Sequence, residues 1–447
     1  MGMSITEKIL ARGAGRRSVS AGQTVWVEVD LLMTHDVCGP GTIGIFEKQF
    51  GADAKVWDPD KVLIIPDHYI FTADAKCHRN IDLLRDFVRR QGLTRYYDPE
   101  FVHAGAGMPT PYADPTQTSY LGVCHAAMLA EGFDRPGQII LGTDSHTCTA
   151  GAVGAFATGI GNTDAGFVLG TGKLWLRVPE GMRFRFEGAM PDYLMAKDLI
   201  LTAIADVGFD GATYRAMEFC GSTVEGLGVE ERSVLCNMAI EAGGKNGVVA
   251  PDDQTVAYVQ ARTDAPFEIL ASDADAWYVY DQTFDTRRIE PVVARPHTPA
   301  NKALAREVDE PIDRAYLGSC TGGKLTDMQA AARVLKGRSV AVETFVVPAT
   351  TRVDAQLDRE TVDGTSLRQI FLDAGCQVGP ASCAACLGGP ADTFGRANAA
   401  INVISATNRN FPGRMGSKDA GVYLASPLTV AASALTGRIT DPRDVLQ

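Results

Sequence analysis

The stretch Gln138-Ile139-Ile140-Leu141-Gly142-Thr143-Asp144-Ser145-His146-Thr147 sets an apolar run directly before a polar one. A short apolar run that ends at a glycine is typical of a strand buried in a parallel sheet. The polar residues then fall at the carboxyl end of the strand, where proteins of alternating strands and helices build their sites. The stretch therefore predicts an α/β fold with functional side chains at the ends of its strands.

The same arrangement occurs earlier in the chain. The apolar run Lys61-Val62-Leu63-Ile64-Ile65-Pro66 is followed at once by Asp67 and His68. Residues 339–347 form a further run of strand type, which Pro348 ends. Helices are predicted between such runs, over residues 5–12, which begin with a capping box, and over residues 82–91, which end at a glycine. This alternation is typical of α/β layers around parallel sheets.

The chain is too long for one ordinary core. Its 447 residues correspond to about three domains at roughly 150 residues each. Apolar–polar alternation replaces a glycine-rich run near residues 177–187, and prolines indicate a linker near residues 288–302. The glycine-rich run, residues 150–172, lacks the spacing of a nucleotide-binding loop and predicts close helix packing. We therefore expect three α/β domains, over residues 1–177, 178–290 and 291–447.

Composition limits the classes of function. Hydrophobic residues make up 45% and charged residues 21% of the chain, and the net charge is −12. No apolar stretch is long enough for a membrane helix, and the N-terminus lacks the pattern of a secretory signal. We therefore expect a cytoplasmic globular protein with no membrane or nucleic-acid partner. An anionic ligand needs local arginines or a metal to hold it against this net charge.

Three of the ten cysteines lie in motifs that carry chemistry. Gly318-Ser319-Cys320-Thr321 follows a predicted strand end, and Ser382-Cys383-Ala384-Ala385-Cys386 lies in a loop rich in glycine and proline. Three thiolates are one short of a closed zinc site, and they suit an iron–sulfur cluster with one iron left free for substrate. A thioredoxin-like redox pair and half of a zinc site are the alternatives, and the spacing alone leaves both open.

Three histidines are candidates for acid–base chemistry. His68 follows an apolar run beside Asp67, and His146 does so close to Asp144. His125 enters a predicted helix. Histidine titrates near neutrality, and a neighbouring carboxylate raises its pKa and orients its ring. Each histidine alone is more often a core or capping residue, and an aspartate in this position also fits a helix cap.

Two arginines occur close together in a loop near the C-terminus. The segment Thr407-Asn408-Arg409-Asn410-Phe411-Pro412-Gly413-Arg414 follows the apolar run 401–404. Guanidinium groups at this spacing are able to bind carboxylates bidentately. Solvated surface charge is the usual explanation of such a pair, and the intervening Asn-Phe-Pro-Gly loop makes it a poorer explanation here.

Taken together, these motifs resemble those of the aconitase superfamily, and in particular its branch of isopropylmalate isomerase and homoaconitase large subunits. The resemblance extends from residue 5 to residue 416. Its specific motifs are, in this order, Gly-Thr-Asp-Ser-His-Thr at 142–147, Gly-Ser-Cys-Thr at 318–321, Ser-Cys-x-x-Cys at 382–386 and Asn-Arg-Asn-Phe-x-Gly-Arg at 408–414. The resemblance implies three α/β domains around an iron–sulfur cluster, and a hydro-lyase that isomerises a substituted malate, above all 2-isopropylmalate.

The resemblance also implies a role for each motif. It places a [4Fe-4S] cluster, whose free iron binds the hydroxyl and a carboxylate of the substrate, on three ligands: Cys320, Cys383 and Cys386. It implies three carboxylate–histidine pairs: Asp67 with His68, Asp144 with His125, and Glu241 with His146. By the same resemblance His68 donates a proton to the departing hydroxyl, and Asn408 lies beside the cluster. Substrate-binding residues are implied at four positions: His35, Ser145, Arg409 and Arg414.

The general base of the family is a serine on a swivelling domain. We expect this chain to lack such a domain, because two-subunit relatives take the serine from a small partner. The resemblance therefore implies a small swivelling-domain subunit as the partner of this chain, a hydroxy-carboxylate as its substrate, and no activity of the chain alone.

Four positions depart from the usual pattern of the family. Gly322 stands in place of asparagine, Ala126 in place of glutamine, Cys38 where threonine is common, and Ala384 in place of glycine. Because polar groups are lost at these positions, the sequence does not decide the identity of the substrate. Homocitrate, dimethylmalate and another substituted malate are alternatives. A cluster-free relative that binds RNA or zinc is a further alternative, and the acidic composition disfavours RNA.

Overall fold

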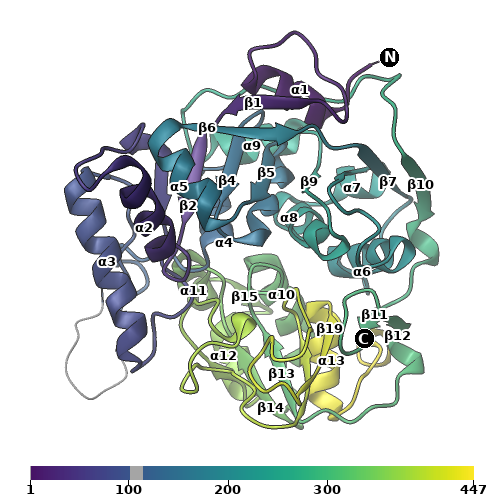
Figure 1. Ribbon diagram of the computed structural model, residues 1–447. Coiled ribbons are helices and arrows are strands. Elements are labelled where there is room, and N and C mark those ends of the chain that lie inside the picture. The colour runs from purple at the N-terminus through teal and green to yellow at the C-terminus, as the bar shows by residue number, and fades with distance from the viewer. Residues whose placement is uncertain (1, 101–113, 447) are drawn as a thin grey trace.

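The computed structural model describes residues 2–100 and 114–446. Its strands form three main sheets flanked by helices, so the predicted α/β class is confirmed. Figure 1 shows the first sheet (purple to blue) beside the second (teal), with the third (green to yellow) below both. Within the described ranges, no helix combines the length and the apolar character that a membrane crossing requires.

The first sheet is parallel, with four strands in the order β3-β2-β4-β5. These strands are β2 (Leu31–Thr34), β3 (Val62–Ile64), β4 (Ile139–Gly142) and β5 (Phe156–Gly159). The helices around it are α2 (Gly39–Phe50), α3 (Ala75–Gln91), α4 (Cys124–Ala130), α5 (Asn162–Thr171) and the 3-10 helices η1 (Pro59–Lys61) and η2 (Ser145–Val153). An N-terminal helix and a two-stranded ribbon adjoin it: α1 (Ile5–Gly13), β1 (Thr24–Glu28) and β6 (Lys173–Arg177). Because β3, β2 and β4 are parallel neighbours, the residues that follow all three emerge at one edge of the sheet.

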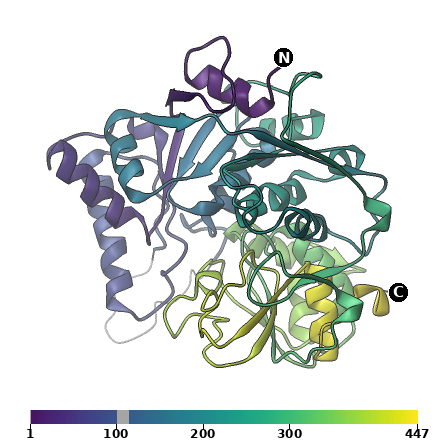
Figure 2. The same cartoon turned by 45° about the vertical axis from the view of Figure 1, so that its right-hand side comes forward.

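The second sheet is also parallel, in the order β10-β7-β8-β9. Its strands are β7 (Gly181–Glu187), β8 (Ala216–Cys220), β9 (Asn246–Val248) and β10 (Tyr280–Asp285). Its helices are α6 (Ala196–Val207), α7 (Ser222–Gly226), α8 (Val229–Asn237), α9 (Asp253–Gln260) and the 3-10 helices η3 (Met238–Ala242) and η4 (Thr286–Arg288). In the view of Figure 2 this part of the chain comes forward, beside the first sheet and above the third.

The third sheet has seven strands in the order β12-β11-β19-β18-β13-β14-β17, with β11 and β12 antiparallel at one edge. The strands are β11 (Val292–Ala294), β12 (Lys302–Leu304), β13 (Arg314–Leu317), β14 (Glu343–Val346), β17 (Gln377–Val378), β18 (Asn402–Ser405) and β19 (Gly421–Ala425). A separate hairpin consists of β15 (Thr361–Val362) and β16 (Thr365–Ser366). The helices are α10 (Leu325–Leu335), α11 (Thr351–Arg359), α12 (Leu367–Asp373), α13 (Pro427–Thr436), η5 (Ala305–Glu307), η6 (Ala385–Leu387) and η7 (Pro442–Asp444).

A close backbone contact joins the first sheet to the second. Helix η2 packs against α8 and β9, and a Cβ atom on Gly151 would lie only 1.8 Å from the carbonyl oxygen of Gly247. A glycine at position 151 therefore allows the two backbones to meet, which places the start of η2 near η3. The glycine-rich run thus serves close packing, as predicted, although it also contains strand β5.

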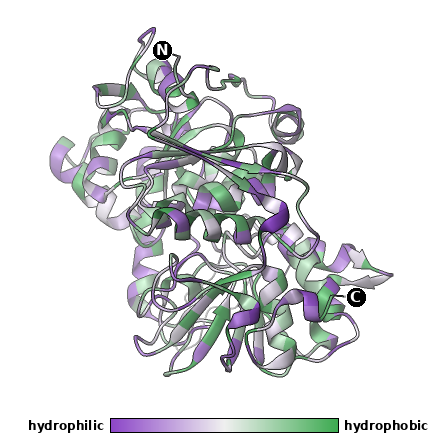
Figure 3. Ribbon diagram, turned by 90° about the vertical axis from the view of Figure 1, so that its right-hand side faces the viewer, coloured by the Kyte–Doolittle hydropathy of each residue, from purple (hydrophilic) through white to green (hydrophobic). Residues whose placement is uncertain are grey.

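Several predicted elements are confirmed with changed boundaries. Helix α1 begins with the expected capping box, in which the Ser4 hydroxyl accepts the Glu7 backbone N–H. Helix α3 ends at Gly92, where φ is +68°, but it begins at Ala75 and not at residue 82, because Asp74 caps it. Figure 3 shows hydrophobic residues on strands of the third sheet, and a mixture of hydrophobic and hydrophilic residues along the helices.

Two predictions about the third sheet need correction. The strand expected over residues 339–347 covers only Glu343–Val346, because the backbone N–H groups of Val340 and Ala341 bond to the ends of α12 and α13 and not to a strand. The stretch expected as a linker, residues 288–302, contains β11, whose three residues are buried and paired with β12 and β19.

Candidate active site

The first sheet brings the predicted acid–base residues to one edge. The side chains that follow its three adjacent strands are His35 and Asp36 after β2, Asp67 and His68 after β3, and Asp144, Ser145 and His146 after β4. All of them are buried except Asp144 and Ser145, which are half-buried. Parallel strand ends meet at one edge of a sheet, so residues distant in the sequence share one site here.

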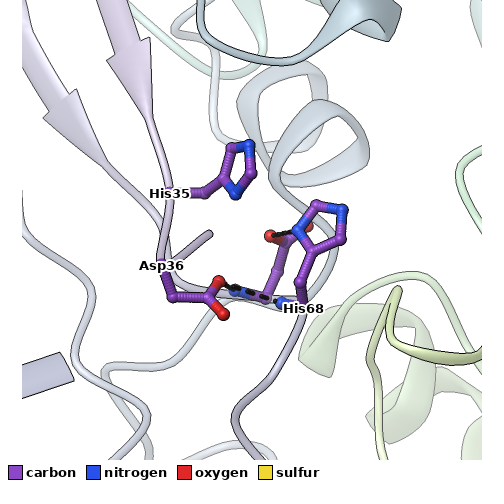
Figure 4. Close-up of side chains that lie close together, drawn as sticks. His35, Asp36 and His68 are labelled. Carbon is purple, nitrogen blue, oxygen red and sulfur yellow. Dashed lines mark hydrogen bonds and ion pairs between the residues drawn. The ribbon is translucent and has the colours of Figure 1, made fainter. Parts of the chain in front are cut away.

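Asp36 orders the segment that carries His68. Its Oδ1 accepts the backbone N–H groups of Asp67 at 2.9 Å and His68 at 3.1 Å, and its Oδ2 accepts that of Tyr69 at 2.7 Å. Figure 4 shows this carboxylate directed at the backbone, with the rings of His35 and His68 close together. The ring centroids lie 4.5 Å apart. Nε2 of His35 is buried without a hydrogen-bond partner in the described part of the chain, so it is available to a ligand.

Asp67 and His68 form a buried pair. Nδ1 of His68 lies 2.6 Å from Oδ1 of Asp67, whose Oδ2 accepts the backbone N–H of Cys124 at 2.8 Å. Burial acts to lower the pKa of His68, but the Asp67 carboxylate outweighs it and raises that pKa to about 10. The ring is therefore held protonated through Nδ1, which leaves Nε2 to face a reacting group.

The four side chains just described also have the spacing of a metal site. The ligand atoms of His35, Asp36, Asp67 and His68 all lie within 4.8 Å of one another. Both carboxylates, however, already accept hydrogen bonds at both oxygens, from backbone N–H groups and from His68. We therefore interpret the group as a network that fixes the orientation of His68.

A second network runs from His125 to Glu241. Oδ1 of Asp144 lies 2.9 Å from Nε2 of His125 and 3.2 Å from Nδ1 of His146. Nε2 of His146 lies 2.9 Å from Oε1 of Glu241, which η3 of the second sheet supplies. Burial opposes the ionisation of Asp144, but hydrogen bonds from the two histidines hold its pKa well below its usual range. Asp144 thus contacts both histidines, and His146 contacts both carboxylates.

The arginine loop extends this network from the third sheet. Arg409 follows β18, and its Nε donates to Oε1 of Glu241 at 2.6 Å. The positive charge of Arg414 acts to lower the pKa of Cys386 and that of Tyr69. Nε of Arg414 is buried and has no hydrogen-bond partner within the described residues. Both arginines therefore lie where they are able to hold an anion.

The three predicted cysteines also meet at this site. Cys320 follows β13, and Cys383 and Cys386 follow β17. All three are buried, and Sγ of Cys383 lies 2.6 Å from Sγ of Cys386. The backbone N–H of Cys383 donates to the carbonyl of Asp67 at 2.9 Å, which ties the cysteine loop to the His68 segment. The three cysteines form one buried cluster with three apolar residues, Val123, Ala126 and Ala349.

The surroundings of these thiols fit an iron–sulfur cluster. The side-chain amides of Asn237 and Asn408 donate to Sγ of Cys320 at 3.1 and 3.4 Å. N–H donors to sulfur are typical outer partners of cluster ligands. A hydrogen bond from the Cys383 thiol lowers the pKa of Cys386 against the effect of burial, and nearby positive charges lower it further. The thiolate is the form that binds iron.

Three of the departing positions have surroundings that the structure defines. Ala126 belongs to the same buried cluster as the three cysteines. Cys38 lies at the start of α2, and burial raises the pKa of its thiol to about 11. A Cβ atom on Gly322 would lie 2.2 Å from Cβ of Ala406 and 2.7 Å from its carbonyl oxygen. The glycine at 322 therefore allows the close approach of two loops, and a side chain there would require one of them to shift.

Sequence reasoning missed three residues of the site. The sequence motifs singled out none of Asp36, Asn237 and Lys197. Asn237 donates to Cys320, and the buried ammonium of Lys197 bonds to the loops that carry Cys320 and Asn408. A lysine in the first turn of the apolar helix α6 was a usable signal, whereas the position of Asn237 depends on how α8 packs.

Comparison with known proteins agrees with the resemblance drawn from the motifs. Residues 7–437 match the aconitase family, described as aconitate hydratase. The chain is 56% identical to the chloroplastic 3-isopropylmalate dehydratase large subunit of Arabidopsis thaliana, over 100% of this chain and 87% of that protein. It is 43% identical to the probable 3-isopropylmalate dehydratase large subunit of Methanothermobacter thermautotrophicus, over 99% of each. It is 40% identical to the 3-isopropylmalate dehydratase large subunit of Heliobacterium modesticaldum, over 100% of each.

Proposed function

The chain belongs to the aconitase family, and on that basis we propose that it is the large subunit of a hydro-lyase that isomerises 2-isopropylmalate to 3-isopropylmalate. The observation that carries the proposal is the meeting of three buried thiols with two carboxylate–histidine networks at the strand ends. Relatives named 3-isopropylmalate dehydratase large subunit, at 40% and 56% identity over the whole chain, favour this substrate over homocitrate or dimethylmalate.

Three residues are assigned as ligands of an iron–sulfur cluster, which we take to be [4Fe-4S]: Cys320, Cys383 and Cys386. When bound, such a cluster supplies an open iron that acts as a Lewis acid on the hydroxyl of the substrate. The amides of Asn237 and Asn408 hold Cys320 in place through its sulfur. Their donation also stabilises negative charge on that sulfur.

His68 is assigned as the proton donor to the departing hydroxyl, which then leaves as water. Its Nδ1 is held by Asp67, and the raised pKa keeps a proton on the ring at neutral pH. General acids of this kind typically accelerate a step by about 10²–10⁴-fold. The network of His125, Asp144, His146 and Glu241 lies beside this pair and orients charge around the substrate.

Binding of the substrate carboxylates is assigned to the residues with free polar atoms. His35 and Arg414 each present a buried nitrogen without a hydrogen-bond partner among the described residues, and Arg409 lies beside Glu241. Ser145 adjoins Asp144 at the start of η2. The positive charge of Arg409 and Arg414 offsets the net charge of −12 that otherwise repels a dianionic substrate.

The remaining catalytic group, the general base, is assigned to a serine of a small swivelling-domain subunit. The support is that the relatives are named as large subunits. We also assign one domain to each main sheet, over residues 1–177, 178–290 and 291–447. The two boundaries fall at β6–β7 and just before β11, where the chain passes from one sheet to the next.

Anaerobic reconstitution with iron and sulfide, followed by assay with 2-isopropylmalate, tests the proposal. We expect 3-isopropylmalate to form when the small subunit of a related enzyme is added, and not with the large chain alone. Turnover of homocitrate without turnover of 2-isopropylmalate would overturn the substrate. A colourless protein that holds zinc and shows no turnover would overturn the hydro-lyase itself.

A further inference from the structure

Lys197 is a buried cation that the proposed reaction does not use. Its side chain is among the largest fully buried ones in the described part of the protein, with an exposed fraction of 1%. Its Nζ donates to the Thr321 hydroxyl at 2.9 Å and to the carbonyl oxygens of Ala406 at 2.8 Å and Thr407 at 2.6 Å. An ammonium has three N–H donors, so these three acceptors satisfy it completely.

The acceptors belong to the two loops that meet at the first cysteine. Thr321 directly follows Cys320, and Ala406 and Thr407 directly precede Asn408. The two loops also contact each other directly, because the Asn408 amide donates to Sγ of Cys320 at 3.4 Å. Lys197 is the second residue of α6, a helix beside the second sheet, whereas both loops follow strands of the third sheet. Lys197 therefore joins the Cys320 loop to the Asn408 loop, and the contact between these two loops holds the Cys320 sulfur.

The Cys320 loop needs support of this kind. Ser319, just before the cysteine, has a φ of +74°, which a residue with a side chain rarely adopts. Such a conformation persists only where surrounding contacts enforce it. Two lysines donate hydrogen bonds to this loop. Lys197 donates to the Thr321 hydroxyl, and Lys324 donates to the carbonyl oxygen of Cys320 at 3.1 Å.

The two lysines differ in how their charge is balanced. Lys324 forms an ion pair with Asp327 at 2.9 Å. Within residues 2–100 and 114–446, Lys197 has no carboxylate at ion-pair distance, and its acceptors are neutral. Burial, followed by repulsion from Lys324, lowers the pKa of Lys197 to about 7, whereas negative charge on Cys320 acts in the opposite direction. A buried charge is costly unless an opposite charge lies near it.

We propose that Lys197 is a positioning residue of the iron–sulfur site, which joins the Cys320 and Asn408 loops and supplies the buried positive charge that balances the thiolate ligands. The inference rests on the proposed function, because it requires a cluster on the three cysteines. Loss of the lysine then loosens the first ligand and removes a positive charge from the surroundings of the cluster. Both changes are measurable without an activity assay.

The test compares the full chain with its K197M and K197Q variants. K197M removes both the donors and the charge, and K197Q keeps amide donors without the charge. K245M is the matched control, since the Lys245 ammonium lies over the Tyr214 ring, 5.3 Å from its centroid, and not between the cysteine loops. Each protein is reconstituted anaerobically, and three quantities are measured: iron and sulfide per chain, the rate of cluster loss to an iron chelator, and the reduction potential.

We expect both Lys197 variants to fold, by circular dichroism, and to lose the cluster to the chelator at least about 10-fold faster than wild type, as when outer partners of metal ligands are removed. We expect their reduction potentials to shift to more negative values, because a nearby positive charge favours the added electron. K245M should match wild type in every readout.

Cluster loss and potential equal to wild type in K197M and K197Q would overturn the inference alone. Failure of both variants to fold as apo-proteins would also overturn it, because the lysine would then serve the core and not the loops around the sulfurs. A wild-type chain that takes up no iron and sulfide would instead overturn the proposed function, and this inference with it.

Discussion

Nε2 of His146 lies 2.9 Å from Oε1 of Glu241, although 95 residues separate the two along the chain. His146 lies at the start of helix η2, beside the first sheet, and Glu241 lies in helix η3, beside the second sheet. Arg409, which follows a strand of the third sheet, donates to the same carboxylate oxygen at 2.6 Å. A single buried carboxylate therefore holds together side chains from all three sheets, which makes it a sensitive position for substitution.

Glu241→Gln should reduce kcat of the reconstituted two-subunit enzyme by about 100-fold or more, because the uncharged amide no longer balances His146 and Arg409. Glu218→Gln is the control, since Glu218, in β8, is also buried but accepts hydrogen bonds from the Ser272 and Tyr278 hydroxyls. Steady-state kinetics with 2-isopropylmalate check both variants. Equal loss of activity in the two would mean that the effect is one of folding.

Cys383→Ser should abolish uptake of a full cluster, because serine is a poor ligand for iron in such sites. Cys376→Ser is the matched control, since Cys376 is a buried cysteine of the same sheet region whose thiol pKa is raised to about 12 by burial. Iron and sulfide are counted after anaerobic reconstitution. Normal iron content in the Cys383 variant would rule that residue out as a ligand.

Gly322→Ala should lower the free energy of unfolding by about 1–3 kcal/mol, because a Cβ atom there would lie 2.2 Å from Cβ of Ala406. Gly44→Ala, inside helix α2, is the contrast, since a Cβ atom there meets nothing within 4 Å. Alanine favours a helix over glycine, so this second change should be neutral or stabilising. Denaturant unfolding of both apo-proteins tests the difference, and equal effects would refute the steric argument.

Asp134 should make the folded chain less stable as pH rises. Burial raises its pKa to about 8, and its Oδ1 has no hydrogen-bond partner in the described part of the chain. Above about pH 4 the unfolded chain releases this proton while the folded chain keeps it, so the carboxyl group lowers stability progressively between about pH 4 and pH 8.

Asp134→Asn should therefore be more stable than wild type at pH 8, by about 1–3 kcal/mol, with the difference shrinking toward pH 4. Urea unfolding of both proteins at the two pH values measures this. A difference that is the same at both pH values would show that the carboxyl group does not titrate as described.

Much of the site follows from local sequence, because polar residues after an apolar strand must emerge at a sheet edge. Asp67, His68, Asp144 and His146 were found in this way, and the strands β3 and β4 lie where the apolar runs predict them. The pairing of His146 with Glu241 came only from the resemblance to a family. It depends on the packing of η2 against the second sheet at Gly151, which no local pattern indicates.

The misjudged segments have a similar cause. Val340 and Ala341 are as apolar as a strand, but their N–H groups bond to helix ends. Residues 292–294 look like part of a proline-rich linker, but tertiary pairing makes them a strand. Lys197 looks like an ordinary helical lysine, and only the folded chain places its ammonium between two loops.

The most direct test of the account is Mössbauer spectroscopy of the chain reconstituted with ⁵⁷Fe, recorded with the small subunit, before and after addition of 2-isopropylmalate. The account predicts a [4Fe-4S] signal in which one iron site changes on addition of the substrate, because only that iron lacks a cysteine ligand. An iron-free protein, or a cluster whose spectrum is unaffected by the substrate, would contradict it.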